Sequence, residues 1–143
     1  KLYKFFLCVI YMISIIVTSF HEHHLEKSII SLVNQKTNYN YEIIVVSPDK
    51  EARELTNKYN IKYFFDPGKG KSYALNLAFK EIKSDILILT DGDVFVNENV
   101  VEEFMKNFKD SKVGVVTGRP IPIDREVISL VIGVIYYLML VHI

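Results

Sequence analysis

The sequence predicts an α/β protein with a mostly parallel, doubly wound sheet and flanking helices. Short apolar, β-branched runs alternate with segments whose apolar residues recur at helical spacing. Such a βαβ rhythm places the strands side by side in a parallel sheet. Acidic residues also follow the ends of several strand-like runs, which is where open α/β sheets bind their ligands.

The first half of the chain shows two strand–helix pairs. Residues 13–18 form a β-branched run that predicts the first strand. A helix over about 22–35 is expected next, because apolar residues recur there at helical spacing: Leu25, Ile29, Leu32 and Val33. Residues 42–46 predict the second strand, and Ser47-Pro48-Asp49 opens a helix to about Tyr59.

The second half repeats the pattern around a glycine loop. Residues 62–65 predict a short strand, and a loop follows at residues 66–70. The helix expected over 71–82 should bury a set of apolar residues: Tyr73 or Ala74, Leu77, Ala78 and Ile82. A fully apolar, buried strand is expected at 86–90, then a helix over 99–108 and a fifth strand at 113–117.

Composition narrows the class of protein. The chain has 143 residues, 50% apolar and 24% charged, which suits one domain with a real core and excludes a disordered or fibrous chain. Lys plus Arg and Asp plus Glu both number 17, which argues against a nucleic-acid partner. The single cysteine, Cys8, excludes an internal disulfide and a multi-cysteine zinc site.

Two apolar stretches raise the question of a membrane. Residues 5–20 suit either a signal segment or a buried strand with its apolar approach, and we favour the strand because no small-residue cleavage site follows. Residues 127–143 are barely long enough to span a bilayer, so a buried or membrane-surface helix is at least as well supported. We expect residues 1–11 to be an N-terminal extension, 12–120 the domain and 121–143 an apolar, helical segment.

Asp91-Gly92-Asp93 follows the fourth predicted strand and is the most informative motif. Two carboxylates at the tip of a strand are hard oxygen ligands that suit Mg²⁺ or Mn²⁺ together with substrate phosphates. The ordinary alternative is a solvated turn, since Asp-Gly is a common turn pair. The structural context, an apolar strand in a sheet of this type, favours the metal.

The glycine loop ends in Gly70-Lys71-Ser72 but is not a P-loop, because Phe65 stands where that motif needs its first glycine. Backbone N–H groups at the helix start, with Lys69 and Lys71, can still approach an anion. An ordinary loop with solvated lysines is the alternative.

Other polar residues follow the first two strands. The metalloprotease pattern H-E-x-x-H would need histidine where Leu25 stands, so the histidines near residue 22 do not predict a zinc site. Glu22 should face the same sheet edge as Asp91, where it either touches a nucleotide or caps a helix. Asp49 either accepts a base N–H or ribose hydroxyl, or complements a helix N-terminus.

Taken together, these phrases resemble the family 2 glycosyltransferases of the GT-A fold from about Ile13 to Pro120. The matching phrases are Ser19-Phe20-His21-Glu22, with His in place of the family's Asn; Ser31-Leu32-Val33-Asn34-Gln35; Tyr41-Glu42-Ile43-Ile44-Val45-Val46; the Gly-Lys-x-x-Ala-x-Asn-x-Ala phrase of residues 70–78; and Asp91-Gly92-Asp93 as the Asp-x-Asp motif. Ser47-Pro48-Asp49-Lys50 departs from the family's Asp-Asp-Gly-Ser and leaves Asp49 as the acidic nucleotide contact.

The resemblance implies an inverting transferase that moves a sugar from a nucleotide-diphospho-sugar donor to a saccharide or lipid-linked acceptor, as in polysaccharide biosynthesis. Asp91 and Asp93 would hold Mn²⁺ or Mg²⁺. The donor-binding residues would be Ser19, Phe20, Glu22, Asp49, Gly70, Lys71, Asn76 and Asp91. Lys69 and Lys71 would add positive charge near the leaving group. A cytoplasmic protein, peripheral to or anchored in the membrane, is expected.

The family's catalytic base lies in an acidic motif far downstream of Asp-x-Asp, and its later Gln-x-x-Arg-Trp phrase is absent here, since the chain has no Trp. Neither Asp124 nor Glu126 is assigned as the base. The chain therefore resembles the donor-binding half without the acceptor-binding half: a truncated or fragmentary chain, or a short family member that a partner completes. A membrane surface is a further expected partner. Two alternatives stay open: a non-catalytic nucleotide-sugar-binding or membrane-docking fragment, and a GT-A-like nucleotidyltransferase, which usually has its basic glycine loop directly after the first strand, where Ser19–Glu22 stands.

Overall fold

The computed structural model describes residues 11–119 and residue 121. These fall into two compact units, one ending at Glu103 and the other starting at Phe104. The elements in chain order are β1 (Ile13–Thr18), α1 (Leu25–Val33), β2 (Tyr41–Ser47), α2 (Lys50–Lys58), β3 (Lys62–Phe65), α3 (Lys71–Glu81), β4 (Ile86–Asp91) and α4 (Val100–Asn107).

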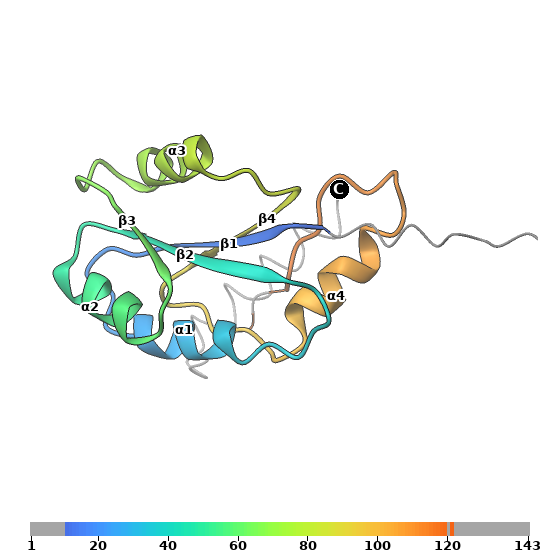
Figure 1. Cartoon of the computed structure of the whole chain (residues 1–143), viewed down its shortest axis with the longest axis horizontal. Coiled ribbons are helices and arrows are strands. Elements are labelled where there is room, and N and C mark those ends of the chain that lie inside the picture. The colour runs from blue at the N-terminus through green and yellow to red at the C-terminus, as the bar shows by residue number, and fades with distance from the viewer. Residues whose placement is uncertain (1–10, 120, 122–143) are drawn as a thin grey trace, which may run out of the picture. The chain divides into compact units, whose positions relative to one another are not determined.

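The four strands form one parallel sheet in the order β3-β2-β1-β4 (Figure 1). Thr18 at the end of β1 lies opposite both Val46 of β2 and Asp91 of β4. Ser47 lies opposite Phe65 at the end of β3. The carboxyl ends of all four strands therefore meet at one edge of the sheet, as a parallel arrangement predicts.

Helices cover both faces of the sheet, which confirms the doubly wound prediction. Helix α3 lies on one face, and α1 and α2 lie on the other (Figure 1). Every residue of β1 is buried as a result. A central parallel strand is covered on both faces, so its sequence is an apolar run without alternation. The interpretation of residues 13–18 as a buried strand is thus correct.

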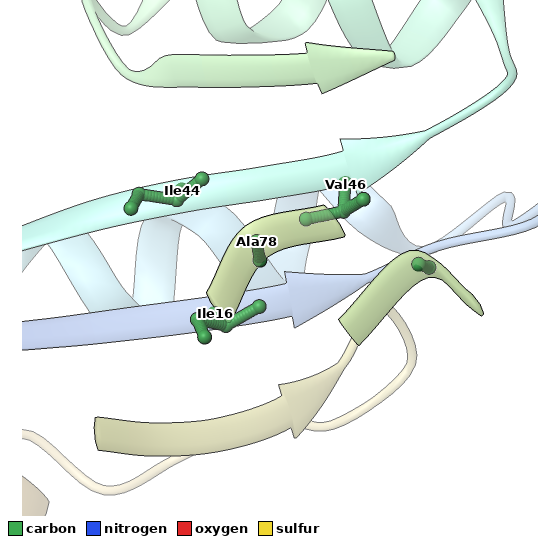
Figure 2. Close-up of a cluster of buried hydrophobic side chains, with 5 residues drawn as sticks. Ile16, Ile44, Val46 and Ala78 are labelled. Atoms are coloured by element: carbon green, nitrogen blue, oxygen red, sulfur yellow. The ribbon is translucent and has the colours of Figure 1, made fainter. Parts of the chain in front are cut away.

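The core beneath α3 explains how this helix is held on the sheet. Its buried residues are Ile16, Ile44, Val46, Ala74 and Ala78, and Figure 2 shows Ala78 between Ile16 of β1 and Ile44 of β2. The small alanines let the helix approach the β-branched side chains closely, and this burial of apolar surface drives the contact. The burial of Ala74 and Ala78 was predicted correctly, but Leu75 packs against this cluster rather than Leu77.

The fourth strand differs from its prediction. Ile86 and Ile88 are buried, but Leu87 and Leu89 are 41% and 51% exposed. The register places Leu89 beside Ile16 and therefore on the face that α3 covers. Helix α3 packs over β1 and β2, whereas β4 is the last strand of the described sheet. An edge strand outside the reach of the helix is buried on one face only, so the prediction of a fully buried strand was wrong.

The predicted fifth strand is also wrong. Residues 113–117 adopt no strand, and Val115 is exposed. Apolar β-branched residues form a strand only where the backbone finds a partner and the side chains find a surface to pack on. The sheet of the described residues has four strands, and this segment pairs with none of them.

Several predictions fall outside the described part of the chain. They are all but one residue of the extension predicted for residues 1–11 and of the helical segment predicted for residues 121–143. Among residues 11–119 and 121, none of the helices combines the length and hydropathy that crossing a bilayer requires.

Candidate functional site at the carboxyl edge of the sheet

The carboxylate of Asp91 is held between strand β1 and the start of helix α3. The Thr18 hydroxyl donates a hydrogen bond to Asp91 Oδ1 at 2.7 Å. The Lys71 ammonium contacts both carboxylate oxygens, Oδ1 at 2.6 Å and Oδ2 at 2.7 Å. The Asp91 and Lys71 side chains are 41% and 58% exposed. A charged pair with fixed geometry therefore stands on the open rim of the sheet.

The loop after β1 packs directly against the Asp91 turn. Gly92 N–H donates to the carbonyl of Thr18 at 3.0 Å. A Cβ atom at Gly92 would lie 3.2 Å from Ser19 Cβ and Oγ and from Glu22 Cγ. A side chain here would crowd all three atoms, so the close approach of the two loops requires glycine.

Glu22 braces the loop that leads into α1. Its Oε1 accepts a hydrogen bond from the backbone N–H of His24, the residue before the helix, at 2.8 Å. Glu22 therefore lies at the same edge as Asp91, as predicted from the sequence, and also organises a helix start.

Helix α3 begins after a loop whose backbone conformation strongly favours glycine at two positions. Gly68 and Gly70 have φ angles of 73° and 98°, in the region that other residues rarely adopt. The Gly70 carbonyl accepts hydrogen bonds from the first turn of α3, which fixes Lys71 as the first helical residue. A Cβ at Gly68 would lie 3.7 Å from the Phe20 ring, so this loop meets the loop after β1. The Lys69 ammonium lies 5.2 Å from the centre of the Tyr73 ring.

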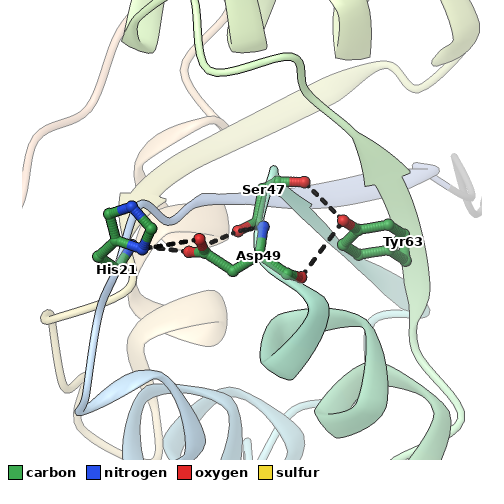
Figure 3. Close-up of polar contacts among 4 residues, drawn as sticks. All are labelled: His21, Ser47, Asp49 and Tyr63. Carbon is green, nitrogen blue, oxygen red and sulfur yellow. Dashed lines mark hydrogen bonds and ion pairs between the residues drawn. The ribbon is translucent and has the colours of Figure 1, made fainter.

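Asp49 follows the end of β2 and ties this connection to the loop after β1 (Figure 3). Its Oδ2 accepts hydrogen bonds from the His21 backbone N–H at 2.6 Å and from the Ser47 hydroxyl at 3.1 Å. Its Oδ1 lies 3.0 Å from His21 Nδ1. Asp49 stands at the N-cap of α2, yet its side chain makes no capping hydrogen bond. Its carboxylate is instead directed toward the loop after β1.

Tyr63 of β3 extends this network. Its hydroxyl donates to the carbonyl of Ser47 at 2.6 Å and lies 3.5 Å from the carbonyl of Asp49 (Figure 3). Burial raises the pKa of Tyr63, and the nearby Asp49 and Asp66 carboxylates raise it further against the opposing charge of Arg53. The Tyr63 hydroxyl therefore stays protonated at neutral pH and donates a hydrogen bond.

Sequence reasoning treated Asp66 as part of a loop, but the structure buries it at the end of β3. Its N–H donates to the Ser47 carbonyl at 3.2 Å. Its Oδ1, like the Ser19 hydroxyl, is buried and has no hydrogen-bond partner among the described residues. Unpaired buried oxygens are costly and uncommon. The available signal was position, since Asp66 follows a strand as Asp49 does.

The remaining predicted residues are less closely joined. Asp93 is exposed in a turn closed by a 3.2 Å hydrogen bond from Val94 N–H to the Asp91 carbonyl. Phe20 is exposed beside the His21 ring, with 4.3 Å between ring centres. Asn76 is exposed on α3. The structure thus gathers Ser19, Phe20, Glu22, Lys71 and Asp91 around the rim.

Two cavities flank Asp49. One of about 280 Å³ includes Ser19, His21, Glu22 and Asp49 among its lining residues. A larger one of about 590 Å³ lies between α2 and β3, against Arg53 and Tyr63. Neither of these two cavities has Asp91 or a residue of the glycine loop in its lining. The Asp91 and Lys71 side chains are both partly exposed.

The donor set at the rim fits a cation that shares its ligands with a substrate. Within residues 11–119 and 121, no cluster of three or more His, Cys, Asp or Glu could enclose a metal ion. Asp91 and Asp93 offer hard oxygen ligands on an accessible turn. Mg²⁺ and Mn²⁺ commonly take one or two carboxylates and complete their coordination with phosphate oxygens and water.

Known proteins are similar to this chain in sequence. A dolichol-phosphate mannosyltransferase of Pyrococcus furiosus is 33% identical over 71% of this chain and 32% of its own length. A hyaluronan synthase of Streptococcus pyogenes is 36% identical over 35% of this chain and 12% of its own length. The chain therefore spans about a third or less of each of these relatives.

Solved structures share the fold. The mannosyltransferase PcManGT from Pyrobaculum calidifontis, solved in complex with GDP-Man and Mn²⁺, matches 71% of this chain and 33% of its own with a TM-score of 0.63 and 20% identity. S. aureus TarS 1-349 matches 80% of this chain and 40% of its own with a TM-score of 0.63 and 18% identity. The glycosyl transferase family 2 model matches residues 14–130, most of the sequence. The chain belongs to glycosyl transferase family 2.

Proposed function

We propose that this chain is the donor-binding part of a metal-dependent, inverting glycosyltransferase. The observation that carries the proposal is the Asp91 carboxylate, fixed by Thr18 at the carboxyl edge of the sheet and in contact with the first residue of α3. Residues 12–120 would form the domain that binds a nucleotide-diphospho-sugar. Membership of family 2 and the GT-A neighbours support this reading over that of a nucleotidyltransferase.

Asp91 and Asp93 would hold Mn²⁺ or Mg²⁺ at the rim. When bound, the cation supplies Lewis-acid stabilisation of the negative charge on the departing nucleoside diphosphate. The chain's own contribution is to place an anion-binding surface beside it. The start of α3 presents backbone N–H groups, and Lys71 presents an ammonium, to the same region.

The nucleoside would lie across the loops after β1 and β2. Phe20 offers an exposed ring, and the buried hydroxyl of its chain neighbour Ser19 has no hydrogen-bond partner among the described residues. Asp49 would accept a base N–H or a ribose hydroxyl. Because His21 and Ser47 already hold this carboxylate in place, its acceptor geometry is set before the donor arrives.

The acceptor is proposed to be a saccharide or a lipid-linked sugar carrier, by similarity to the hyaluronan synthase and dolichol-phosphate mannosyltransferase relatives. The general base that deprotonates the acceptor would come from a region beyond this chain, since the chain spans 32% of the mannosyltransferase relative. A cytoplasmic location at the membrane surface fits such an acceptor. Donor binding without turnover by this chain alone is therefore the expected behaviour.

Calorimetry with Mn²⁺ and a set of nucleoside diphosphates tests the proposal. We expect tight binding only with metal, and at least about tenfold weaker binding for Asp93→Asn, corresponding to about 1.4 kcal/mol. Glu81→Gln, an exposed acid at the end of α3, should bind like the wild type. Equal affinities with and without Mn²⁺ would refute the metal site. The same titration identifies the preferred base.

A further inference from the structure

The Lys71 ammonium contacts both oxygens that Asp91 would offer to a metal ion. It bridges Oδ1 at 2.6 Å and Oδ2 at 2.7 Å, while Thr18 donates to Oδ1 as well. A carboxylate has about four lone-pair positions, and these contacts take three of them. Lys71 would therefore compete with a metal ion for the Asp91 carboxylate.

Simultaneous binding of a divalent cation and the Lys71 ammonium to the Asp91 carboxylate is electrostatically unfavourable. Mg²⁺ binds oxygen at about 2.0–2.1 Å, and Lys71 already sits within hydrogen-bond distance of both oxygens. The two positive charges would stand a few ångströms apart and repel each other. Thr18 faces no such conflict, because a hydroxyl is neutral and its oxygen also lies 3.5 Å from the Thr90 carbonyl.

Resting on the proposed function, we propose that Lys71 exchanges partners during donor binding. It pairs with Asp91 until the metal binds, and then moves to the diphosphate of the donor. The side chain can move, since it is more exposed than the carboxylate it contacts and stands on a long flexible stem at the first position of α3. Lys71 thereby opposes binding of the metal alone and favours binding of the metal and the nucleotide together.

This exchange makes the metal and nucleotide affinities depend on each other. Metal binding frees Lys71 for the diphosphate, and diphosphate binding removes Lys71 from the metal ligand. By thermodynamic reciprocity, each ligand raises the affinity for the other by the same factor. A lysine that merely attracted phosphate would strengthen nucleotide binding without weakening metal binding.

The test measures Mn²⁺ alone, UDP and GDP alone, and each combination, on the 143-residue chain. Mn²⁺ binding is followed by electron paramagnetic resonance of the free ion, and nucleotide binding by calorimetry. For Lys71→Met we expect Mn²⁺ alone to bind at least about fivefold more tightly, a change of about 1 kcal/mol. Mn²⁺ increases nucleotide affinity by a certain factor in each protein, and we expect this factor to be at least about fivefold smaller in Lys71→Met than in the wild type.

Lys69→Met is the matched control for the loss of a nearby positive charge. Lys69 lies in the same loop but over the Tyr73 ring, so its removal should raise Mn²⁺ affinity much less. Lys71→Gln repeats the test with a polar side chain and guards against misfolding of the first variant. If the wild type binds nucleotide with metal dependence but Lys71→Met and Lys71→Gln bind Mn²⁺ no more tightly, the exchange is overturned while the proposed function stands. If the wild type shows no metal dependence, both proposals fall.

Discussion

The two edges of the sheet carry similar polar clusters with different surroundings. The amino-edge cluster joins Ser14 of β1, Glu42 of β2 and Lys62 of β3, with Glu42 accepting from both. The carboxyl-edge cluster joins Thr18, Asp91 and Lys71 in the same way. Each is one hydroxyl, one carboxylate and one lysine, so chemistry alone does not separate a structural cluster from a binding site.

The difference lies in which elements supply the three groups. All members of the amino-edge cluster stand on neighbouring strands, whose positions the backbone ladder fixes. In the carboxyl-edge cluster the lysine stands at a helix start that follows a glycine loop, and the carboxylate opens onto a turn. The first cluster pins strands together, whereas the second can release a partner. The carboxyl edge is also where open α/β sheets bind their ligands.

The largest expected difference between the two clusters is in how far mutation of the carboxylate weakens nucleotide binding. Asp91→Asn should weaken nucleoside diphosphate binding in the presence of Mn²⁺ by at least about thirtyfold, or about 2 kcal/mol, because it removes a charged ligand. Glu42→Gln makes the same chemical change at the other edge and should bind like the wild type. Calorimetry with UDP and GDP measures both. Equal losses in the two variants would contradict the distinction between the clusters.

A smaller difference between the two clusters is expected in the free energy of unfolding. Burial by itself raises the pKa of Glu42, but the hydrogen bonds from Lys62 and Ser14 outweigh it and hold the pKa below its ordinary value of 4.5. A lowered folded pKa contributes stability above the unfolded value, and this is lost as the pH falls through the folded value. Glu42→Gln should therefore cost about 1 kcal/mol at neutral pH and progressively less in acid.

Urea unfolding between neutral pH and about pH 3 measures this change. Asp91→Asn should alter the free energy of unfolding by less than about 0.5 kcal/mol at neutral pH, since exposed ion pairs contribute little. A larger loss of stability for Asp91→Asn than for Glu42→Gln would reverse the assignment of the two clusters.

The smallest expected effect concerns Tyr63, which joins β3 to the carboxyl edge. Tyr63→Phe loses the hydrogen bond to the Ser47 carbonyl and should cost about 0.5–1 kcal/mol near pH 8. Burial, with Asp49 and Asp66, raises the pKa of Tyr63 above 10.0. A raised folded pKa contributes stability that is full below the unfolded pKa and is lost as the pH rises through the folded value.

The wild type should therefore lose its advantage over Tyr63→Phe above about pH 10, which urea unfolding in alkaline buffer measures. A gap that widens with rising pH would contradict this account of Tyr63.

Most of the fold was predictable because the four strands and their helices are encoded locally. The β3 strand at residues 62–65 was predicted with correct bounds, and α3 differs by one residue at its end. The errors came from context. Residues 113–117 have the composition of a strand but pair with none of the described strands, and Leu87 and Leu89 are exposed because α3 covers other strands. Neither the missing strand nor the exposure of the two leucines can be predicted from the local sequence.

The site was predictable to the extent that it follows strand ends. Asp91 and Glu22 were placed at one edge from the order of elements, and the family resemblance placed Lys71 near the leaving group. Thr18, the partner of Asp91, was not predicted, and neither were Tyr63 and Asp66 beside Ser47, since none of the three carries a motif. The role of His21 was missed as well, because its contact with Asp49 joins two loops separated by a helix and a strand.

The amino-acid sequence by itself determined the alternation of strands and helices, the parallel sheet and the identity of the acids at its edge. Periodicity and strand order suffice for these, because they depend on near neighbours and on a rule that all parallel sheets obey. Only the tertiary structure decided which groups the acids contact: Lys71 on Asp91, and His21 on Asp49. Those contacts join residues 20 to 28 positions apart, and such pairings exist only once the chain has folded.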